Sequence, residues 1–327
     1  MNPNDALALL AELTRLDAPP GYEGPVRAWL QARLPAGYTA RTDGLGNLLV
    51  LPDGAAAPRG LVVAPLDEVG FMAQPGPAAG WVRLAPLGPA PLPGPAAARV
   101  RFADGTRGVL TPDPAVPTPK AWADWLCDVA PATVPTGQTA VWDTAPRPQG
   151  SRLLGKAAGS RAALLAAYLA LHAARPHCPV AWVFASREHV PGHGAAPAAY
   201  GLQPAWAVRV VPALAGDRPG QRVPGLTVGR GPGLRRREWG RVADPRLTAW
   251  LERAFATHPW PYQPEVPADR EPGWASLPLV AAGLPTATLS IPTRNLHAAH
   301  AAVDIGDVLA AAHGLQAALE SDCDPLG

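Results

Sequence analysis

The segment Gly60-Leu-Val-Val-Ala-Pro-Leu-Asp-Glu-Val-Gly-Phe-Met72 decides how the chain folds. It opens with a short, continuous apolar run, Gly60–Ala64, which follows two predicted helices over residues 5–16 and 26–34. Apolar runs of this kind between helices are typical of strands in a sheet that helices cover on both faces. The segment therefore predicts an α/β fold.

The pattern on either side of this segment predicts how the chain is divided. From residue 151 onward helices and strands alternate, with helices expected at 161–174, from Asp244 and at 305–319, and strands at 180–185, 206–211 and 287–291. Between residues 73 and 150 prolines cluster and short strand-like runs replace the helical pattern. We therefore expect one α/β domain, residues 1–72 and 151–327, interrupted by an inserted β domain at 73–150.

Composition excludes several classes of partner. The 28 basic and 26 acidic residues leave a formal net charge of +2, which gives no reason to expect binding to nucleic acid or a membrane surface. The three cysteines are far apart and form no C-x-x-C pair, as in proteins of reducing compartments. The N-terminus does not resemble a signal peptide, and no apolar run approaches the roughly 20 residues of a bilayer span. We expect a soluble, cytoplasmic protein.

Four segments carry a resemblance to a known family. They are residues 62–72, Gly155-Lys-Ala-Ala-Gly-Ser-Arg161, Val183-Phe-Ala-Ser-Arg-Glu-His-Val190 and Ser290-Ile-Pro-Thr-Arg-Asn-Leu-His297. Their order and spacing resemble the glutamyl aminopeptidase family, which includes the tetrahedral aminopeptidases. The resemblance implies a three-layer α/β/α metallopeptidase-like domain whose insertion is a small β-barrel that serves oligomerisation. It also implies removal of N-terminal residues from peptides by two metal ions, usually zinc, and self-association into dimers or dodecameric shells.

The first two segments depart from the family at its metal ligands. Pro65 stands where the family has a ligand histidine, although the aspartate that would orient it remains as Asp67. Gly159 and Ser160 occupy the places of two aspartates, one of which bridges both metals in the family. Neither proline nor glycine has a side chain that binds zinc.

The later segments keep only part of the family's site. Glu188 matches the general base, and the glutamate ligand that follows it is His189. The ligand aspartate of the next strand aligns with Arg209, and the final ligand histidine is intact as His297. An arginine about 5 Å from a dication would add about 7 kcal/mol of repulsion at an effective dielectric of about 20.

These changes lead to an expectation about function. We expect an aminopeptidase-family homologue that has lost two-metal peptide hydrolysis, is not an enzyme, carries no metal cofactor and acts as a binding or assembly subunit. Glu188 would then be a vestigial base, and His297 the only retained ligand. Self-association is expected, and an active paralogue is a candidate partner.

Two alternatives stay open. One is an active metal-dependent aminopeptidase with zinc or cobalt in a rearranged site of His189 and His297, with Glu188 as base and His193 or His300 as further ligands. The other is a sensor of a small anion or peptide terminus.

The sensor alternative depends on the charge of Arg209. A guanidinium group binds carboxylates and phosphates through two parallel hydrogen bonds. Its ligand pocket would comprise Arg209, His189 and His297. In either case a buried Asp67 needs a partner, for which Arg209 and His297 are the candidates.

Overall fold

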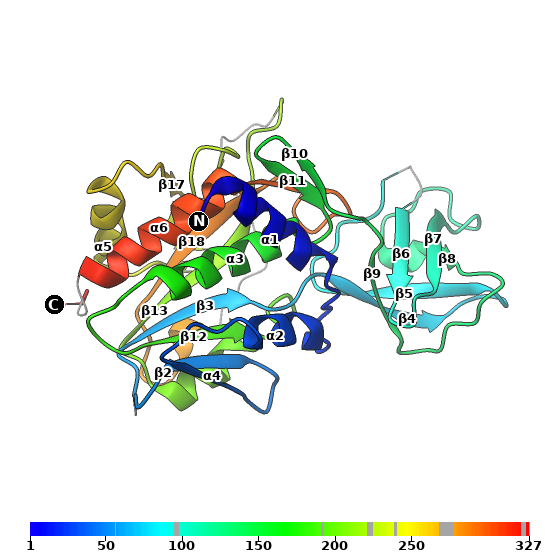
Figure 1. Ribbon diagram of the computed structural model, residues 1–327. Helices are drawn as coiled ribbons and strands as arrows, with labels where there is room; N and C mark the ends of the chain where they lie inside the picture. The colour runs from blue at the N-terminus through cyan, green and yellow to red at the C-terminus, as the bar shows by residue number, and fades with distance from the viewer. Residues whose placement is uncertain are drawn as a thin grey trace.

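A mixed eight-stranded sheet forms the centre of the larger part of the molecule (Figure 1). The computed structural model describes residues 1–55, 57–94, 98–190, 193–220, 225–238, 241–267, 277–321 and 325–326. In spatial order the strands are β1 (Tyr38–Thr42), β2 (Leu48–Pro52), β12 (Val180–Ala185), β3 (Gly60–Pro65), β13 (Trp206–Leu214), β18 (Thr286–Thr293), β14 (Gly233–Arg235) and β17 (Gln263–Glu265).

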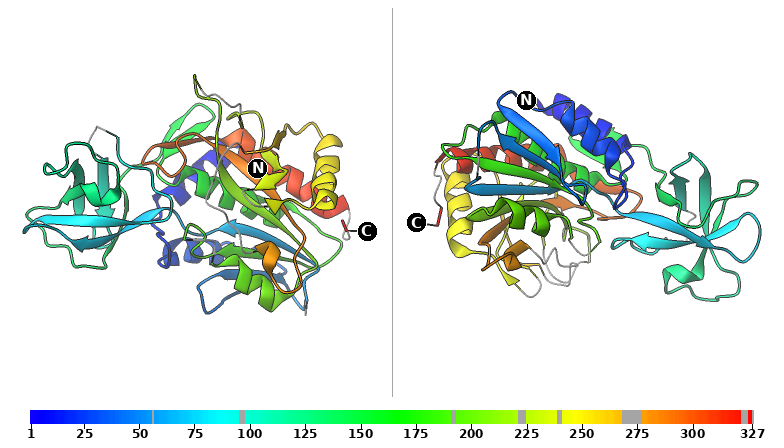
Figure 2. Two further views of the ribbon diagram at one scale, coloured as in Figure 1. Left: turned by 180° about the vertical axis from the view of Figure 1, so that it is seen from behind. Right: turned by 90° about the horizontal axis from the view of Figure 1, so that it is seen from below.

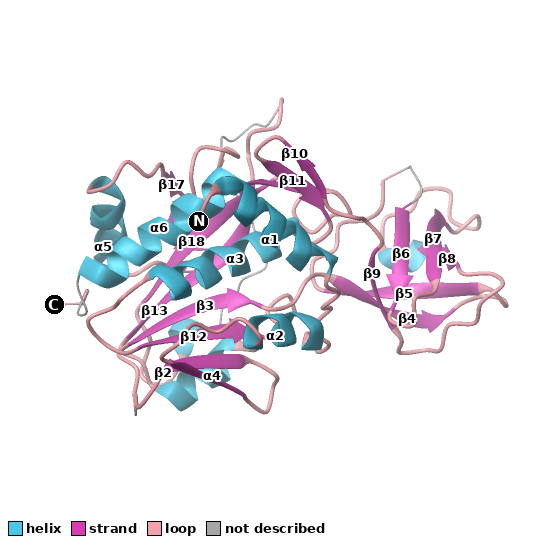
Figure 3. Cartoon of the chain, in the orientation of Figure 1, coloured by secondary structure: helices cyan, strands magenta, loops and turns pink. Residues whose placement is uncertain are grey.

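Helices cover both faces of this sheet (Figure 3). They are α1 (Pro3–Arg15), α2 (Gly24–Gln31), α3 (Ala158–Ala173), α4 (Ala195–Leu202), α5 (Pro245–Ala256) and α6 (Ile305–Ser321). Among the described residues, none of the helices is both long and apolar enough to cross a bilayer.

The two faces of strand β3 show why the sheet is a middle layer. Val62 and Ala64 pack into the core that α1, α3, α5 and α6 share, whereas Leu61 and Val63 pack into a second core with α4. Successive side chains of a strand point to opposite faces, so a continuous apolar run needs cover on both sides. The predicted α/β fold is confirmed.

A closed β-barrel stands beside the sheet (Figure 2). Its strands, in order around the barrel, are β4 (Gly70–Pro75), β5 (Trp81–Leu87), β8 (Trp125–Asp128), β7 (Arg107–Pro112), β6 (Ala98–Phe102) and β9 (Thr139–Trp142). Phe71, Phe102 and Trp142 are among the side chains that fill its interior. The expected barrel is confirmed, and the domain boundaries at residues 73 and 150 stay a prediction.

Short elements connect the barrel to the main sheet. Strands β10 (Arg147–Gln149) and β11 (Arg152–Gly155) lie between the end of the barrel and α3 in the chain, and β19 (Ala301–Asp304), which precedes α6, joins them in a three-stranded sheet. The remaining elements are β15 (Arg237–Glu238), β16 (Arg241–Val242) and the 3-10 turns Trp122–Asp124 and Leu277–Leu279.

Helix boundaries follow local capping signals, with one important difference. The Asp244 carboxylate accepts hydrogen bonds from the backbone N–H groups of Arg246 and Leu247, so α5 begins where its cap and proline predict. By contrast, α3 begins at Ala158 rather than at the expected residue 161. Glycine and serine are weak helix formers, but the first turn accepts them. This earlier start places Gly159 and Ser160 in the first turn of the helix.

The crossing of α5 and α6 depends on a glycine. A Cβ atom at Gly314 would lie 2.1 Å from Cζ of the buried Phe255 ring. Gly314→Ala is therefore expected to lower the free energy of unfolding by about 1–3 kcal/mol in chemical denaturation. Gly201→Ala is the control, because this helical glycine has no atom within 4 Å of its Cβ position and should gain about 0.5–1 kcal/mol. Equal effects at the two positions would contradict this account of the packing.

Candidate active site

Two neighbouring strands deliver the candidate site residues to one edge of the sheet. β3 and β12 are parallel and end level with one another, since Pro65 pairs with Ala185. Asp67 follows the first strand, and Glu188 and His189 follow the second. The carboxyl ends of adjacent parallel strands are where α/β folds place their ligand sites.

Asp67 and His189 form a buried carboxylate–imidazole contact. The Oδ2 atom of Asp67 accepts a hydrogen bond of 2.8 Å from the backbone N–H of His189, and Oδ1 lies 2.9 Å from the His189 Nδ1 atom. Both side chains are fully shielded from solvent. A carboxylate beside Nδ1 favours the tautomer in which Nδ1 carries the proton. The expected pairing of Asp67 with Arg209 or His297 stays a prediction, and the side-chain contact that the structure shows is with His189.

Ser160 completes a line of three side chains. Its Oγ atom lies 3.1 Å from the Nε2 atom of His189, on the opposite side of the ring from Asp67. With the proton on Nδ1, the Ser160 hydroxyl donates and Nε2 accepts. The order hydroxyl, imidazole, carboxylate is that of a Ser–His–Asp triad, which is recognised by geometry rather than by sequence position.

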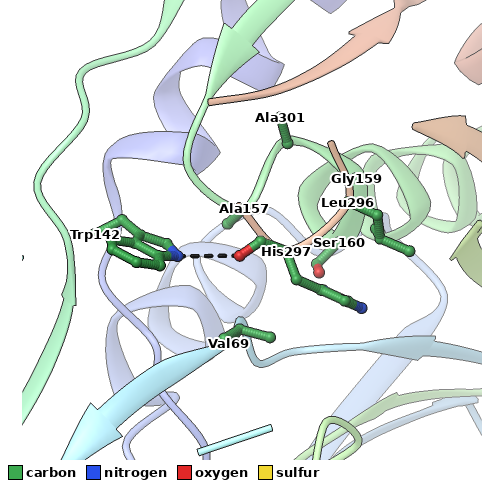
Figure 4. Close-up of a pocket in the computed structure, with 8 residues that line it drawn as sticks. All are labelled: Val69, Trp142, Ala157, Gly159, Ser160, Leu296, His297 and Ala301. Atoms are coloured by element: carbon green, nitrogen blue, oxygen red, sulfur yellow. Dashed lines mark hydrogen bonds between the residues drawn. The ribbon is translucent and has the colours of Figure 1, made fainter. Parts of the chain in front are cut away.

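The Ser160 side chain borders a small cavity (Figure 4). The cavity has a volume of about 10 Å³, and its lining residues are Val69, Trp142, Ala157, Gly159, Ser160, Leu296, His297 and Ala301. This is about the space that one water molecule needs. Figure 4 shows the Ser160 and His297 side chains among the residues that line this cavity.

His297 is held in an unusual backbone conformation by the barrel. Its φ angle is +66°, which non-glycine residues rarely adopt, and its carbonyl accepts a hydrogen bond of 3.0 Å from Trp142 Nε1 (Figure 4). The His297 ring meets the His189 ring edge to face at 5.1 Å. Burial holds the pKa of His297 well below its usual value, and a protonated His189 would lower that pKa further, so the His297 ring is neutral near pH 7.

Glu188 and Arg209 add two buried charges. Both are shielded from solvent, and a Glu188 Oε1 atom accepts a hydrogen bond of 2.9 Å from the backbone N–H of Ala195. Burial raises the pKa of Glu188, and the charge of Arg209 opposes that rise. The charge of Arg209 thus stabilises a carboxylate that would otherwise be costly to bury.

A second charged cluster binds the residues on either side of Asp67 in the chain. The Glu68 carboxylate accepts hydrogen bonds from Lys156 Nζ at 2.6 Å and from Arg161 Nη2 at 3.2 Å, and all three side chains are buried. Arg161 Nη1 also donates to the Leu66 carbonyl at 2.6 Å. These contacts fix the backbone on both sides of Asp67. The sequence analysis gave Lys156, Arg161 and Glu68 no role, although all three lie in the quoted segments.

The donor set does not fit the pair of divalent ions that the resemblance implies. A Cβ atom at Gly159 would lie 2.6 Å from Thr293 Oγ1 and 3.0 Å from Pro212 Cβ, so a carboxylate at this position has no space. Pro65 offers no ligand, and Arg209 brings a buried positive charge. No group of three or more His, Cys, Asp or Glu side chains in the described part of the chain could hold a metal ion. The expected lack of a metal cofactor itself stays a prediction.

The structure thus brings together most of the predicted site residues. Asp67, Ser160 and His189 are in contact, His297 packs on His189, and Arg209 interacts with Glu188. The additional histidines of the rearranged metal site, His193 and His300, are exposed. What the sequence analysis missed is the role of Ser160, which it treated only as a lost ligand. The signal was present in the residue types: a serine, a histidine and an aspartate at three positions of one family site.

Comparison with known proteins relates the whole chain to peptidases. A family model described as M42 glutamyl aminopeptidase matches residues 123–313. A candidate aminopeptidase of Acetivibrio thermocellus is 24% identical over 321 residues, which cover 94% of this chain and 96% of that protein. An aminopeptidase structure from Desulfurococcus kamchatkensis superposes with a TM-score of 0.88 at 25% identity, covering 98% of this chain and 96% of that one.

A further structural relative is described through its assembly. The TET1 peptidase of Pyrococcus horikoshii, which can assemble into a tetrahedron or a large octahedral shell, superposes with a TM-score of 0.82 at 19% identity. The match covers 98% of this chain and 100% of that chain. At this identity the likeness concerns the fold.

These matches correct one expectation. The prediction that the chain is not an enzyme is wrong, because the matched family and the relatives that span nearly the whole chain are aminopeptidases. The prediction equated the loss of metal ligands with the loss of catalysis. The replacements also supply a hydroxyl and an imidazole, Ser160 and His189, which are groups that can catalyse hydrolysis without a metal.

Proposed function

Since the chain belongs to the M42 glutamyl aminopeptidase family, we propose that it is a hydrolase that releases N-terminal residues from peptides without using paired metal ions. The reaction takes place where β3, β12 and the first turn of α3 meet. The observation that carries the proposal is the contact of Ser160 with His189 and of His189 with Asp67. The resemblance aligns these three residues with metal ligands of the family or with the residue that orients a ligand. Family membership supports the substrate class, and the contacts support the metal-free chemistry.

The surroundings of His189 support this proposal over a rearranged metal site. One ring nitrogen lies beside the Asp67 carboxylate and the other beside the Ser160 hydroxyl. A metal-bound histidine must give one nitrogen to the metal, so ligation would break one of these contacts. Arg209 would in addition repel a cation.

Chelation tests the metal-free chemistry. Purified protein treated with EDTA or dipicolinate is expected to keep its rate of amino acid release from aminoacyl anilides and dipeptides, because the proposed groups carry no metal. Rates before and after dialysis, and after addition of zinc or cobalt, are the measurement. A rate that falls on chelation and returns with either metal would contradict the proposal and favour the rearranged metal site.

Self-association is part of the same proposal. A relative of the same fold assembles into closed shells, and this chain keeps a closed barrel of the kind that the resemblance assigns to oligomerisation. Light scattering is expected to give a mass of at least twice the chain's 33.9 kDa. An active paralogue as partner and a cytoplasmic location stay predictions.

A further inference from the structure

We infer that Ser160 is a nucleophile that forms a covalent acyl intermediate, with His189 as its base and Asp67 as the group that orients His189. The substrates are amides or esters whose acyl group carries a short, apolar side chain. This inference names the reacting group of the hydrolase proposed above and rests on that proposal.

Two hydrogen bonds and one close approach place the three side chains in the order that a serine nucleophile needs, although Asp67 Oδ1 and His189 Nδ1 approach each other without the alignment of a hydrogen bond. The hydroxyl lies 3.1 Å from Nε2, and the carboxylate lies 2.9 Å from Nδ1 of the same ring. The backbone N–H of His189 donates to the other oxygen of Asp67, which fixes the carboxylate relative to the ring. A base that a third group orients is the general signature of an activated hydroxyl nucleophile.

The position of Ser160 in α3 adds a site for negative charge. The first intrahelical hydrogen bond of α3 runs from the Arg161 N–H to the Ala157 carbonyl, so the amides of Gly159 and Ser160 precede it. Ala157, which begins this turn, has a φ angle of +54°, a conformation that non-glycine residues rarely adopt. Amide groups at a helix N-terminus stabilise an oxyanion that develops beside them.

These groups support a two-step acyl transfer through Ser160. Ser160 Oγ attacks the substrate carbonyl carbon while its proton moves to His189 Nε2, and the oxygen of the tetrahedral intermediate faces the amides of the first turn. Collapse breaks the bond to the leaving amine or alcohol, which takes the proton from His189, and leaves the acyl group on Ser160. A water molecule then attacks this ester with His189 as base, which releases the carboxylic acid and restores the hydroxyl.

The walls of the cavity set the substrate class. Val69, Leu296, Ala157 and Ala301 line it beside Ser160, and its volume of about 10 Å³ leaves room for little more than one water molecule. Any acyl group is larger than this space, so the lining side chains must move to admit one, and they move least for a short apolar group. The apolar lining therefore favours acyl groups with short, apolar side chains.

Covalent labelling tests the inference directly. The whole chain is incubated with an alkyl fluorophosphonate, which loses fluoride to an activated serine, and is then analysed by intact and peptide mass spectrometry. We expect one phosphonyl group per chain, on Ser160, and none on the Ser160→Ala variant. Asp67→Asn and His189→Gln should slow labelling by about 10³-fold or more.

The control is another buried serine. Ser290 is fully buried in β18 and takes no part in the three contacts, so Ser290→Ala should label as the wild type does. Thermal unfolding of each variant shows whether it is folded. A wild type that takes up no phosphonate, or a label that persists in Ser160→Ala, would overturn the inference.

Two measurements on the same protein, phosphonate labelling of Ser160 and release of amino acids from aminoacyl anilides, test this inference and the proposed function separately. If the protein releases amino acids in EDTA but carries no label on Ser160, the nucleophile is refuted and the proposed function stands. If Ser160 is labelled but no amino acid is released from anilides or peptides, the nucleophile stands and the proposed substrates are refuted.

Discussion

Asp67→Asn is expected to lower kcat for aminoacyl anilides by about 10³–10⁴-fold while the protein stays folded. An asparagine whose oxygen still accepts the backbone N–H of His189 would turn its amide N–H₂ toward Nδ1. The ring would then carry its proton on Nε2 and could no longer accept the proton of Ser160. Steady-state kinetics on matched protein samples is the measurement.

The control for this prediction is a second aspartate in an ion pair. Asp113 pairs with Arg83 at 2.7 Å in the barrel, outside the cavity that Ser160 borders. Asp113→Asn should leave kcat within about twofold of the wild type. A small loss of kcat in Asp67→Asn would show that the carboxylate only satisfies a buried histidine and does not set its tautomer.

Glu68→Ala is expected to lower the free energy of unfolding by about 3–5 kcal/mol. The substitution removes the carboxylate that Lys156 and Arg161 share, so two buried cations lose the negative charge that pairs with both of them. Asp17 stands 3.1 Å from Lys156, but it is one-third exposed and cannot replace Glu68 for Arg161. Since Arg161 also holds the carbonyl before Asp67, the variant should lose hydrolytic activity as well.

Chemical denaturation measures this effect against an exposed ion pair. Glu12 lies 3.0 Å from Arg33, and both side chains are about two-fifths exposed. Glu12→Ala should cost no more than about 1 kcal/mol, because solvent screens such pairs. Similar losses for Glu12→Ala and Glu68→Ala would mean that the buried cluster contributes little to holding the site.

The sequence predicted β3, β12, β13 and β18 because each of these strands contains a short, nearly continuous apolar run. The predicted range of β12 agrees with the structure at both ends, since Pro179 precedes the strand and Ser186 follows it. Strand β1, Tyr38–Thr42, was missed because it is an edge strand with exposed side chains. The antiparallel hydrogen bonds of β1 with β2 stabilise it as a strand, although its polar residues alone do not predict one.

The candidate site could be predicted only in part from the sequence. The family resemblance placed Asp67, Ser160 and His189 in one metal site. It treated Ser160 and His189 only as replacements of metal ligands and Asp67 as the partner of a lost one, so it did not predict that the three side chains meet. Their mutual contact depends on two three-dimensional facts: α3 starts early enough to place Ser160 in its first turn, and β3 and β12 end side by side. Neither follows from residue spacing, because the three segments are far apart in the chain.

The central claim is that this family member hydrolyses its substrates through side chains rather than through paired metal ions. Elemental analysis of the same chromatographic fractions whose turnover is assayed tests it most directly. Equal turnover per chain is expected in every fraction, whatever its zinc, cobalt or manganese content. Turnover that rises in proportion to bound metal and reaches its maximum at two ions per chain would contradict it.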